Sequence, residues 1–232
     1  MKLVLLPGLD GTGELFSPLT EALQSYGITD IQIVRYHPQR MESYDTLVEH
    51  LLTQLPKEEY VLFAESFSGP IAYRIAQQKP KHLASLIIAA SFLKNPRPFL
   101  LHTLKFLPAN LFAYPMPRWL IRLFLLGKEA DDALVGRCQE AIAGVSSKVL
   151  MFRLNEIRKL QERSLDNAPL EIPTLYIQVQ EDILVREKSF EDWKAVCAHI
   201  TRYRVKGKHL IAQSNPQKCA LAIAQRFYYG QH

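Results

Sequence analysis

Ser66 has the sequence surroundings of a catalytic nucleophile. It lies in the segment VLFAESFSG (61–69), where an apolar run leads into a small-x-Ser-x-small pattern and a helical stretch follows. A serine at a sharp turn between a strand and a helix exposes its hydroxyl above a sheet. Crowding at that turn requires small residues two positions before and two positions after the serine. Ala64 and Ser68 meet this requirement. The segment predicts a serine for acyl-transfer chemistry, and a serine that only caps a helix is the ordinary alternative.

A nucleophilic serine needs a base, and the base needs a carboxylate that orients it. His209 lies just after the last predicted strand, at the start of the final helical region. Asp182 follows the predicted strand 174–179, at the end of a sheet where open α/β sheets bind their ligands. The neighbouring Glu181 is the alternative carboxylate. We expect Ser66, Asp182 and His209 to act together.

Backbone N–H groups must also stabilise the oxyanion that forms on the acyl carbonyl. We expect one from Phe67, directly after the nucleophile, and one from Leu9 in the loop PGLDGTG (7–13). Glycines in this loop allow the backbone to approach a ligand closely. A dinucleotide loop is the alternative, but the glycines do not fit G-x-G-x-x-G and no acidic residue closes the next strand.

These residues require a sheet that brings distant loops to one edge. Short, almost entirely apolar runs alternate with helical patterns, which predicts a doubly wound, parallel α/β sheet covered on both faces. The predicted strands are 3–6, 31–35, 60–63, 83–89, 174–179 and 201–205. The predicted helices are 14–26, 43–55, 67–78, 187–199 and 215–228.

The region between the fourth and fifth predicted strands departs from this alternation. It is about eighty residues long, far beyond an ordinary connection, and it contains several prolines and helical patterns at 119–126, 131–145 and 147–163. We therefore predict a core of residues 1–90 and 170–232 with a helical cap inserted at 91–169. Residues 94–128 contain six Lys or Arg and no Asp or Glu, together with many apolar side chains, most of which we expect to form the core of the cap.

The segments LLPGLDGTG, AESFSG, QEDILV and GKHL occur in the order found in the α/β-hydrolase superfamily, and the chain resembles its small serine esterases. The resemblance implies the chain order Ser66, Asp182, His209 and a sheet reduced to about six parallel strands. It implies a serine hydrolase, of carboxylesterase or thioesterase type, that cleaves a carboxylic ester through an acyl-enzyme, with no metal and no cofactor. Pro7 stands where the superfamily commonly has His, and Ala64 replaces the first glycine of the turn.

Three other functions remain open from the sequence. An acyltransferase would use the same three residues, as would an esterase or thioesterase acting on acyl carrier protein. A non-catalytic binding module of the same fold is the third.

The basic, apolar stretch of the cap predicts an acidic partner, either acyl carrier protein or anionic lipid. A net charge of +5, without basic runs interleaved with aromatic residues, does not favour nucleic-acid binding. Three widely spaced cysteines favour a reduced, cytoplasmic protein.

Overall fold

The computed structural model describes residues 1–104, 114–160 and 169–229. Within these ranges six strands form one sheet in the order β2-β1-β3-β4-β5-β6, and every neighbouring pair is parallel. The strands are β1 (Lys2–Leu6), β2 (Ile31–Ile33), β3 (Tyr60–Glu65), β4 (Leu83–Ala89), β5 (Thr174–Val179) and β6 (Ile200–Val205). The expected α/β fold with six parallel strands is confirmed.

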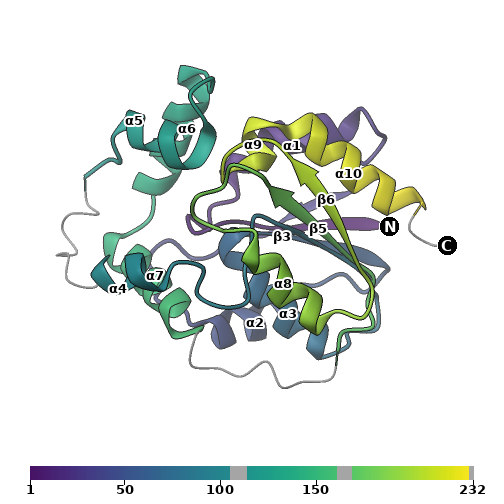
Figure 1. Cartoon of the computed structure of the whole chain (residues 1–232). Coiled ribbons are helices and arrows are strands. Elements are labelled where there is room, and N and C mark those ends of the chain that lie inside the picture. The colour runs from purple at the N-terminus through teal and green to yellow at the C-terminus, as the bar shows by residue number, and fades with distance from the viewer. Residues whose placement is uncertain (105–113, 161–168, 230–232) are drawn as a thin grey trace.

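Helices cover both faces of the sheet (Figure 1). One face is covered by α1 (Ser17–Gln24), α9 (Ile211–Ser214) and α10 (Pro216–Tyr229). The other is covered by α2 (Tyr44–Leu52), α3 (Gly69–Gln77) and α8 (Lys188–Val196). Two 3₁₀ turns, η1 (Glu14–Phe16) and η2 (Ser66–Ser68), lead into α1 and α3.

The apolar character of the central strands explains why they are buried on both faces. In β1, Leu3, Val4, Leu5 and Leu6 are all fully buried, and their side chains alternate between the two core clusters on opposite faces of the sheet. Parallel strands buried in this way have near-continuous apolar sequences. The sequence pattern was therefore a direct signal of the layer arrangement.

The strand order reverses between β1 and β3, since β2 lies beside β1 and β4 lies beside β3. Open α/β sheets bind ligands beyond the carboxyl ends of their strands at such a reversal. The loop 7–13 follows β1 and Ser66 follows β3, so the strand order brings these two segments together.

The segment between β4 and β5 is helical in its described parts and lies to one side of the sheet in Figure 1. It contains α4 (Pro98–Leu104), α5 (Arg118–Leu120), the π-helix η4 (Ile121–Leu126), α6 (Asp132–Ala143) and α7 (Ser147–Lys159). We call residues 91–169 the helical insertion. Helix α4 was not predicted from the sequence, where prolines at positions 96 and 98 hid the start of a helix. The predicted end of the last helix, at 161–163, falls outside the described residues.

The helical insertion shares its buried surfaces with the sheet domain. Ile157 and Leu160 at the end of α7 join the main core, and α6 and η4 pack with Leu15 and Leu210 of the sheet domain. The expectation that most of its apolar side chains are buried is wrong for a group that is exposed in the structure: Phe99, Leu100, Tyr114, Trp119 and Leu123.

In the described parts of the chain, no helix combines the length and the apolar character that crossing a bilayer requires.

Candidate active site

Ser66 occupies a strained turn at the end of β3. Its φ of 49° is in the left-handed region, which a residue with a side chain rarely adopts. The side chains on either side of the turn, Ala64 and Ser68, are fully buried. The hydroxyl of Ser91, in the segment just after β4, donates to the carbonyl of Ser66 and so holds the turn. This is the geometry that presents a serine hydroxyl above a sheet.

The structure brings Ser66, His209 and Asp182 into one chain of hydrogen bonds. Ser66 Oγ lies 2.7 Å from His209 Nε2, and His209 Nδ1 lies 2.7 Å from Asp182 Oδ2. The other carboxylate oxygen, Asp182 Oδ1, accepts hydrogen bonds from the N–H groups of Leu184 and Val185 at 2.8 and 2.9 Å. Both oxygens of Asp182 are therefore engaged, and the carboxylate is fixed in the orientation that serves His209.

The alternative carboxylate, Glu181, does not contact His209. Its side chain forms ion pairs with Lys206 and Lys208 at 3.9 and 3.7 Å. Asp182 lies three residues after the end of β5 and is buried, whereas the Glu181 side chain is 44% exposed. The direction of the loop after β5 determines which of the two adjacent acids reaches His209. The sequence alone left this choice open.

The surroundings of His209 favour its protonated form. Burial disfavours the imidazolium, but the charge and hydrogen bond of Asp182 and the charge of Glu65 outweigh this cost, so the pKa of His209 is raised. Ser66 is 7% exposed and His209 6%, so little water competes for their hydrogen bond. The arrangement can transfer the proton of the Ser66 hydroxyl to His209 when the oxygen attacks a carbonyl.

Two backbone N–H groups are the candidates for binding an oxyanion. Phe67 is the second residue of η2, which continues into α3, and the first N–H groups of a helix have no acceptor within it. Leu9 lies in a turn that is closed by a hydrogen bond of 3.1 Å from Gly11 N to Gly8 O. Among the described residues, Leu9 N–H has no hydrogen-bond acceptor. Their role as oxyanion donors stays a prediction.

Glu65, directly before the nucleophile, is a buried acid that the sequence analysis did not consider. It is 2% exposed, and its Oε2 accepts a hydrogen bond of 3.0 Å from Gln213 Nε2 in α9. In the described residues its other oxygen, Oε1, is buried without a partner. Burial raises the pKa of this carboxyl to about 7. A glutamate at the buried end of β3 was visible in the sequence as a break in an apolar run, and that break was the available signal.

Arg153 in α7 is the other polar residue that the sequence analysis missed. Its guanidinium donates to the carbonyl oxygens of Leu9 and Asp10, 144 and 143 positions earlier in the chain. An arginine in a helical pattern ordinarily faces solvent, so no local signal distinguished this one.

No three His, Cys, Asp or Glu side chains cluster as a metal site in the described ranges. The three cysteines are buried and free.

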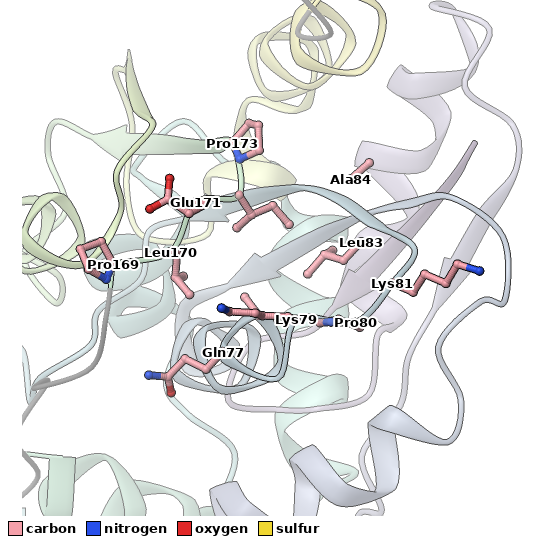
Figure 2. Close-up of a pocket in the computed structure, with 12 residues that line it drawn as sticks. Gln77, Lys79, Pro80, Lys81, Leu83, Ala84, Pro169, Leu170, Glu171 and Pro173 are labelled. Atoms are coloured by element: carbon pink, nitrogen blue, oxygen red, sulfur yellow. The ribbon is translucent and has the colours of Figure 1, made fainter.

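A hollow of about 750 Å³ lies at the amino ends of the strands, opposite the end that carries Ser66, and Figure 2 shows the residues around it. It is lined by the end of α3, the start of β4 and the residues that precede β5, including Lys79, Leu83 and Pro173. These residues lie at the amino ends of the strands, whereas Ser66 follows the carboxyl end of β3. The hollow is therefore separate from the candidate active site.

The fold and the arrangement around Ser66 define an α/β hydrolase of the serine type. A family model described as serine aminopeptidase, S33, matches residues 35–212, which include Ser66, Asp182 and His209. The chain belongs to this family. A comparison with curated proteins finds no match.

Solved structures with the same fold cover nearly the whole chain. Cfl2 from Burkholderia cenocepacia has a TM-score of 0.75 and 18% identity over 98% of this chain and 87% of its own. MenH from S. aureus has a TM-score of 0.73 and 15% identity over 100% and 95%. Proline iminopeptidase from Mycobacterium smegmatis has a TM-score of 0.69 and 14% identity over 99% and 89%. At these identities the likeness concerns the fold.

Proposed function

We propose that this serine hydrolase cleaves carboxylic esters through an acyl-enzyme on Ser66. The observation that carries the proposal is the continuous hydrogen-bond chain from Ser66 through His209 to Asp182, with two distances of 2.7 Å. This chain supports the proposal, because a nucleophile and its base must lie within hydrogen-bond reach, with a third group orienting the base.

In the first step Ser66 Oγ attacks the acyl carbonyl carbon and His209 Nε2 takes the hydroxyl proton. The carbonyl oxygen becomes an oxyanion that Leu9 and Phe67 N–H stabilise, a contribution of about 3–4 kcal/mol for a single donor. His209 then gives the proton to the leaving alkoxide. In the second step water attacks the acyl group on Ser66, His209 accepts the water proton, and the acid leaves as the Ser66 hydroxyl is restored.

The carboxylates around Ser66 bear on the choice between an ester and a peptide with a free amino terminus. An aminopeptidase site needs an accessible acidic group for the substrate ammonium. Asp182 Oδ2 is bound by His209, and Asp10 Oδ2 accepts from the Thr12 hydroxyl and N–H at 2.6 and 2.9 Å. Asp10 Oδ1 accepts no hydrogen bond from the described residues, which keeps a peptide substrate open. The unpartnered oxygen of Glu65 is sealed from solvent, and residues 94–128 of the helical insertion contain no acid.

The predicted acidic partner at the helical insertion stays a prediction, and the ion pairs of the insertion bear on it. Arg118 and Arg122 both bind the carboxylate of Asp132, at 2.7 and 2.6 Å, and Lys94 binds Asp192 at 3.0 Å. Of the five basic residues at 94–128 that the structure describes, three are therefore already paired. We consequently place recognition of an apolar acyl group ahead of electrostatic docking.

The proposed function is tested with one substrate panel on the wild type and on Ser66→Ala. The panel contains nitrophenyl esters of increasing acyl length, matched thioesters on coenzyme A and on acyl carrier protein, and amino-acid nitroanilides. We expect ester hydrolysis, labelling of Ser66 by a fluorophosphonate, and a loss of kcat of about 10⁶-fold in the variant. Faster cleavage of the nitroanilides than of the esters would contradict the esterase proposal and indicate a peptidase.

Activity that survives Ser66→Ala, on protein that is folded and unlabelled, would contradict the whole mechanism. A competing alcohol added to the ester assay separates hydrolysis from acyl transfer, because transfer yields a new ester instead of the free acid.

A further inference from the structure

Arg153 carries a charge that the fold buries almost completely. It is 2% exposed, and among the described residues no carboxylate lies within ion-pair distance of its guanidinium. A buried charge without compensation is strongly destabilising. The structure must therefore supply another reason for an arginine at this position of α7.

The direct contacts that compensate this charge come from backbone carbonyl groups of the sheet domain, and the more distant charges of Asp10 and Glu42 also favour it. Arg153 Nη1 donates to the carbonyl oxygens of Leu9 and Asp10 at 2.9 and 2.8 Å, and Nη2 donates to that of His37 at 3.3 Å. The guanidinium also lies over the ring of Tyr36, 5.6 Å from its centroid. These contacts satisfy a planar, multidentate donor, and a lysine could make only part of them.

The guanidinium of Arg153 fits against the loop after β1 only because residue 11 is a glycine. A Cβ atom on Gly11 would lie 2.6 Å from Arg153 Nη1, which is closer than such contacts occur in proteins. Gly11 also has a φ of +70°, which favours glycine. The loop is therefore shaped to receive the guanidinium.

The other carbonyl groups of this loop are also held. Ser68 Oγ, two positions after the nucleophile, donates to Pro7 O, and Gly11 N donates to Gly8 O. Tyr36 N donates to Gly11 O at 2.8 Å. With Arg153 on the remaining two, every carbonyl from residue 7 to residue 11 has a hydrogen-bond donor.

Fixing the carbonyl groups fixes the N–H groups, because each peptide unit is planar. The hydrogen bond to Gly8 O sets the direction of the Leu9 N–H, which belongs to the same peptide unit. The hydrogen bonds from Arg153 hold the next two units and prevent the turn from rotating. An oxyanion donor is effective only when its position is fixed before the reaction.

We propose that Arg153 is a positioning residue that extends from the helical insertion and locks the oxyanion loop, so that Leu9 N–H points toward the reacting carbonyl beside Ser66. The inference rests on the proposed function, because it assigns Leu9 N–H the oxyanion. It also gives the insertion a direct part in the chemistry: α7 determines the order of a loop that lies 144 residues away in the sequence.

The test compares Arg153→Met and Arg153→Lys with Arg158→Met as a matched control. Arg158 lies on the same helix and is partly exposed, and within the described ranges its side chain bonds only to the neighbouring Asn155, at 3.0 Å. We expect kcat for the best ester to fall about 10²-fold in Arg153→Met, with KM within about 3-fold, because loss of an oxyanion donor costs about 10²–10³ in rate. Arg153→Lys should retain part of the activity, and Arg158→Met should stay within about 2-fold of the wild type.

A trifluoromethyl ketone with the same acyl chain provides the decisive readout, since its adduct with Ser66 carries the oxyanion. Its affinity should fall in parallel with kcat in both Arg153 variants, while a non-reactive alcohol analogue binds as in the wild type. Wild-type kcat in folded Arg153→Met would overturn the inference. So would a fall in kcat without loss of ketone affinity, because that pattern indicates damage to the acid–base residues. If Arg153→Met does not fold, Arg153→Lys decides by the same two measurements.

Failure of the proposed function has a different signature. In that case the wild type itself shows no ester hydrolysis that depends on Ser66, whatever residue occupies position 153.

Discussion

The two sides of Ser66 are held in opposite ways. On the acid–base side, His209 and Asp182 come from loops after β6 and β5, and their ionisable side chains bond directly to each other and to Ser66. On the proposed oxyanion side the donors are backbone N–H groups, and the side chains of Arg153 and Ser68 donate to the carbonyl groups of the same loop. One side works through charge and must respond to pH, whereas the other works through geometry and should not.

The same contrast explains what the sequence could and could not predict. The fold follows from apolar runs of strand length, and Ser66, Asp182 and His209 each follow such a run, so their types and places are local signals. Nothing near Arg153 in the sequence predicts its role. Its partners are backbone carbonyl groups about 140 positions away, and any residue type would supply the same carbonyl group.

The helical insertion was the least predictable region for a related reason. Its prolines hid α4, and which of its apolar side chains are buried depends on where it packs on the sheet domain. Ile157 enters the main core while Trp119 is exposed, although both lie in helical segments with apolar neighbours.

Among these variants, Asp182→Asn should cause the largest loss of activity, because it disrupts the acid–base side. The amide presents no negative charge to His209 and favours the wrong tautomer of the imidazole, so we expect kcat to fall about 10⁴-fold. The oxyanion side is untouched, and a residual rate above that in water should remain. Steady-state kinetics with the preferred ester measure the loss; a change of less than 10-fold would mean that Asp182 does not orient His209.

Ser68→Ala tests the oxyanion side with a smaller effect. It removes the hydrogen bond to Pro7 O and leaves that buried carbonyl and the Tyr36 hydroxyl without their partner, at a cost to the free energy of unfolding of about 1–3 kcal/mol. We expect kcat to fall about 10-fold while the pH dependence of kcat/KM keeps its acid limb. Tyr36→Phe is the matched control, because it leaves the contact between Ser68 and Pro7 intact. A shifted acid limb in Ser68→Ala would erase the distinction between the two sides.

Glu65→Gln sharpens the comparison, because it removes a charge from the acid–base side while conserving shape. When the Glu65 carboxyl is ionised, its negative charge helps to raise the pKa of His209. Without it, His209 loses its proton at lower pH, so the acid limb of kcat/KM should move to lower pH while the maximal kcat changes less than about 3-fold. Rates measured from pH 5 to pH 9 check this, and an unchanged limb would show that Glu65 does not act on His209.

The same variant should change how stability depends on pH. Burial raises the pKa of Glu65 from 4.5 to about 7, so between these values the folded protein keeps a proton that the unfolded chain has lost. The wild type therefore loses stability as the pH rises through this window, by about 3 kcal/mol in total at about 1.4 kcal/mol per pKa unit. Glu65→Gln lacks this loss, so urea unfolding should show the variant gaining on the wild type from pH 5 to pH 7 and a constant difference above about pH 8. A difference that is flat across the range would mean that the Glu65 carboxyl is ionised throughout, and that the unpartnered oxygen at the end of β3 has a proton donor after all.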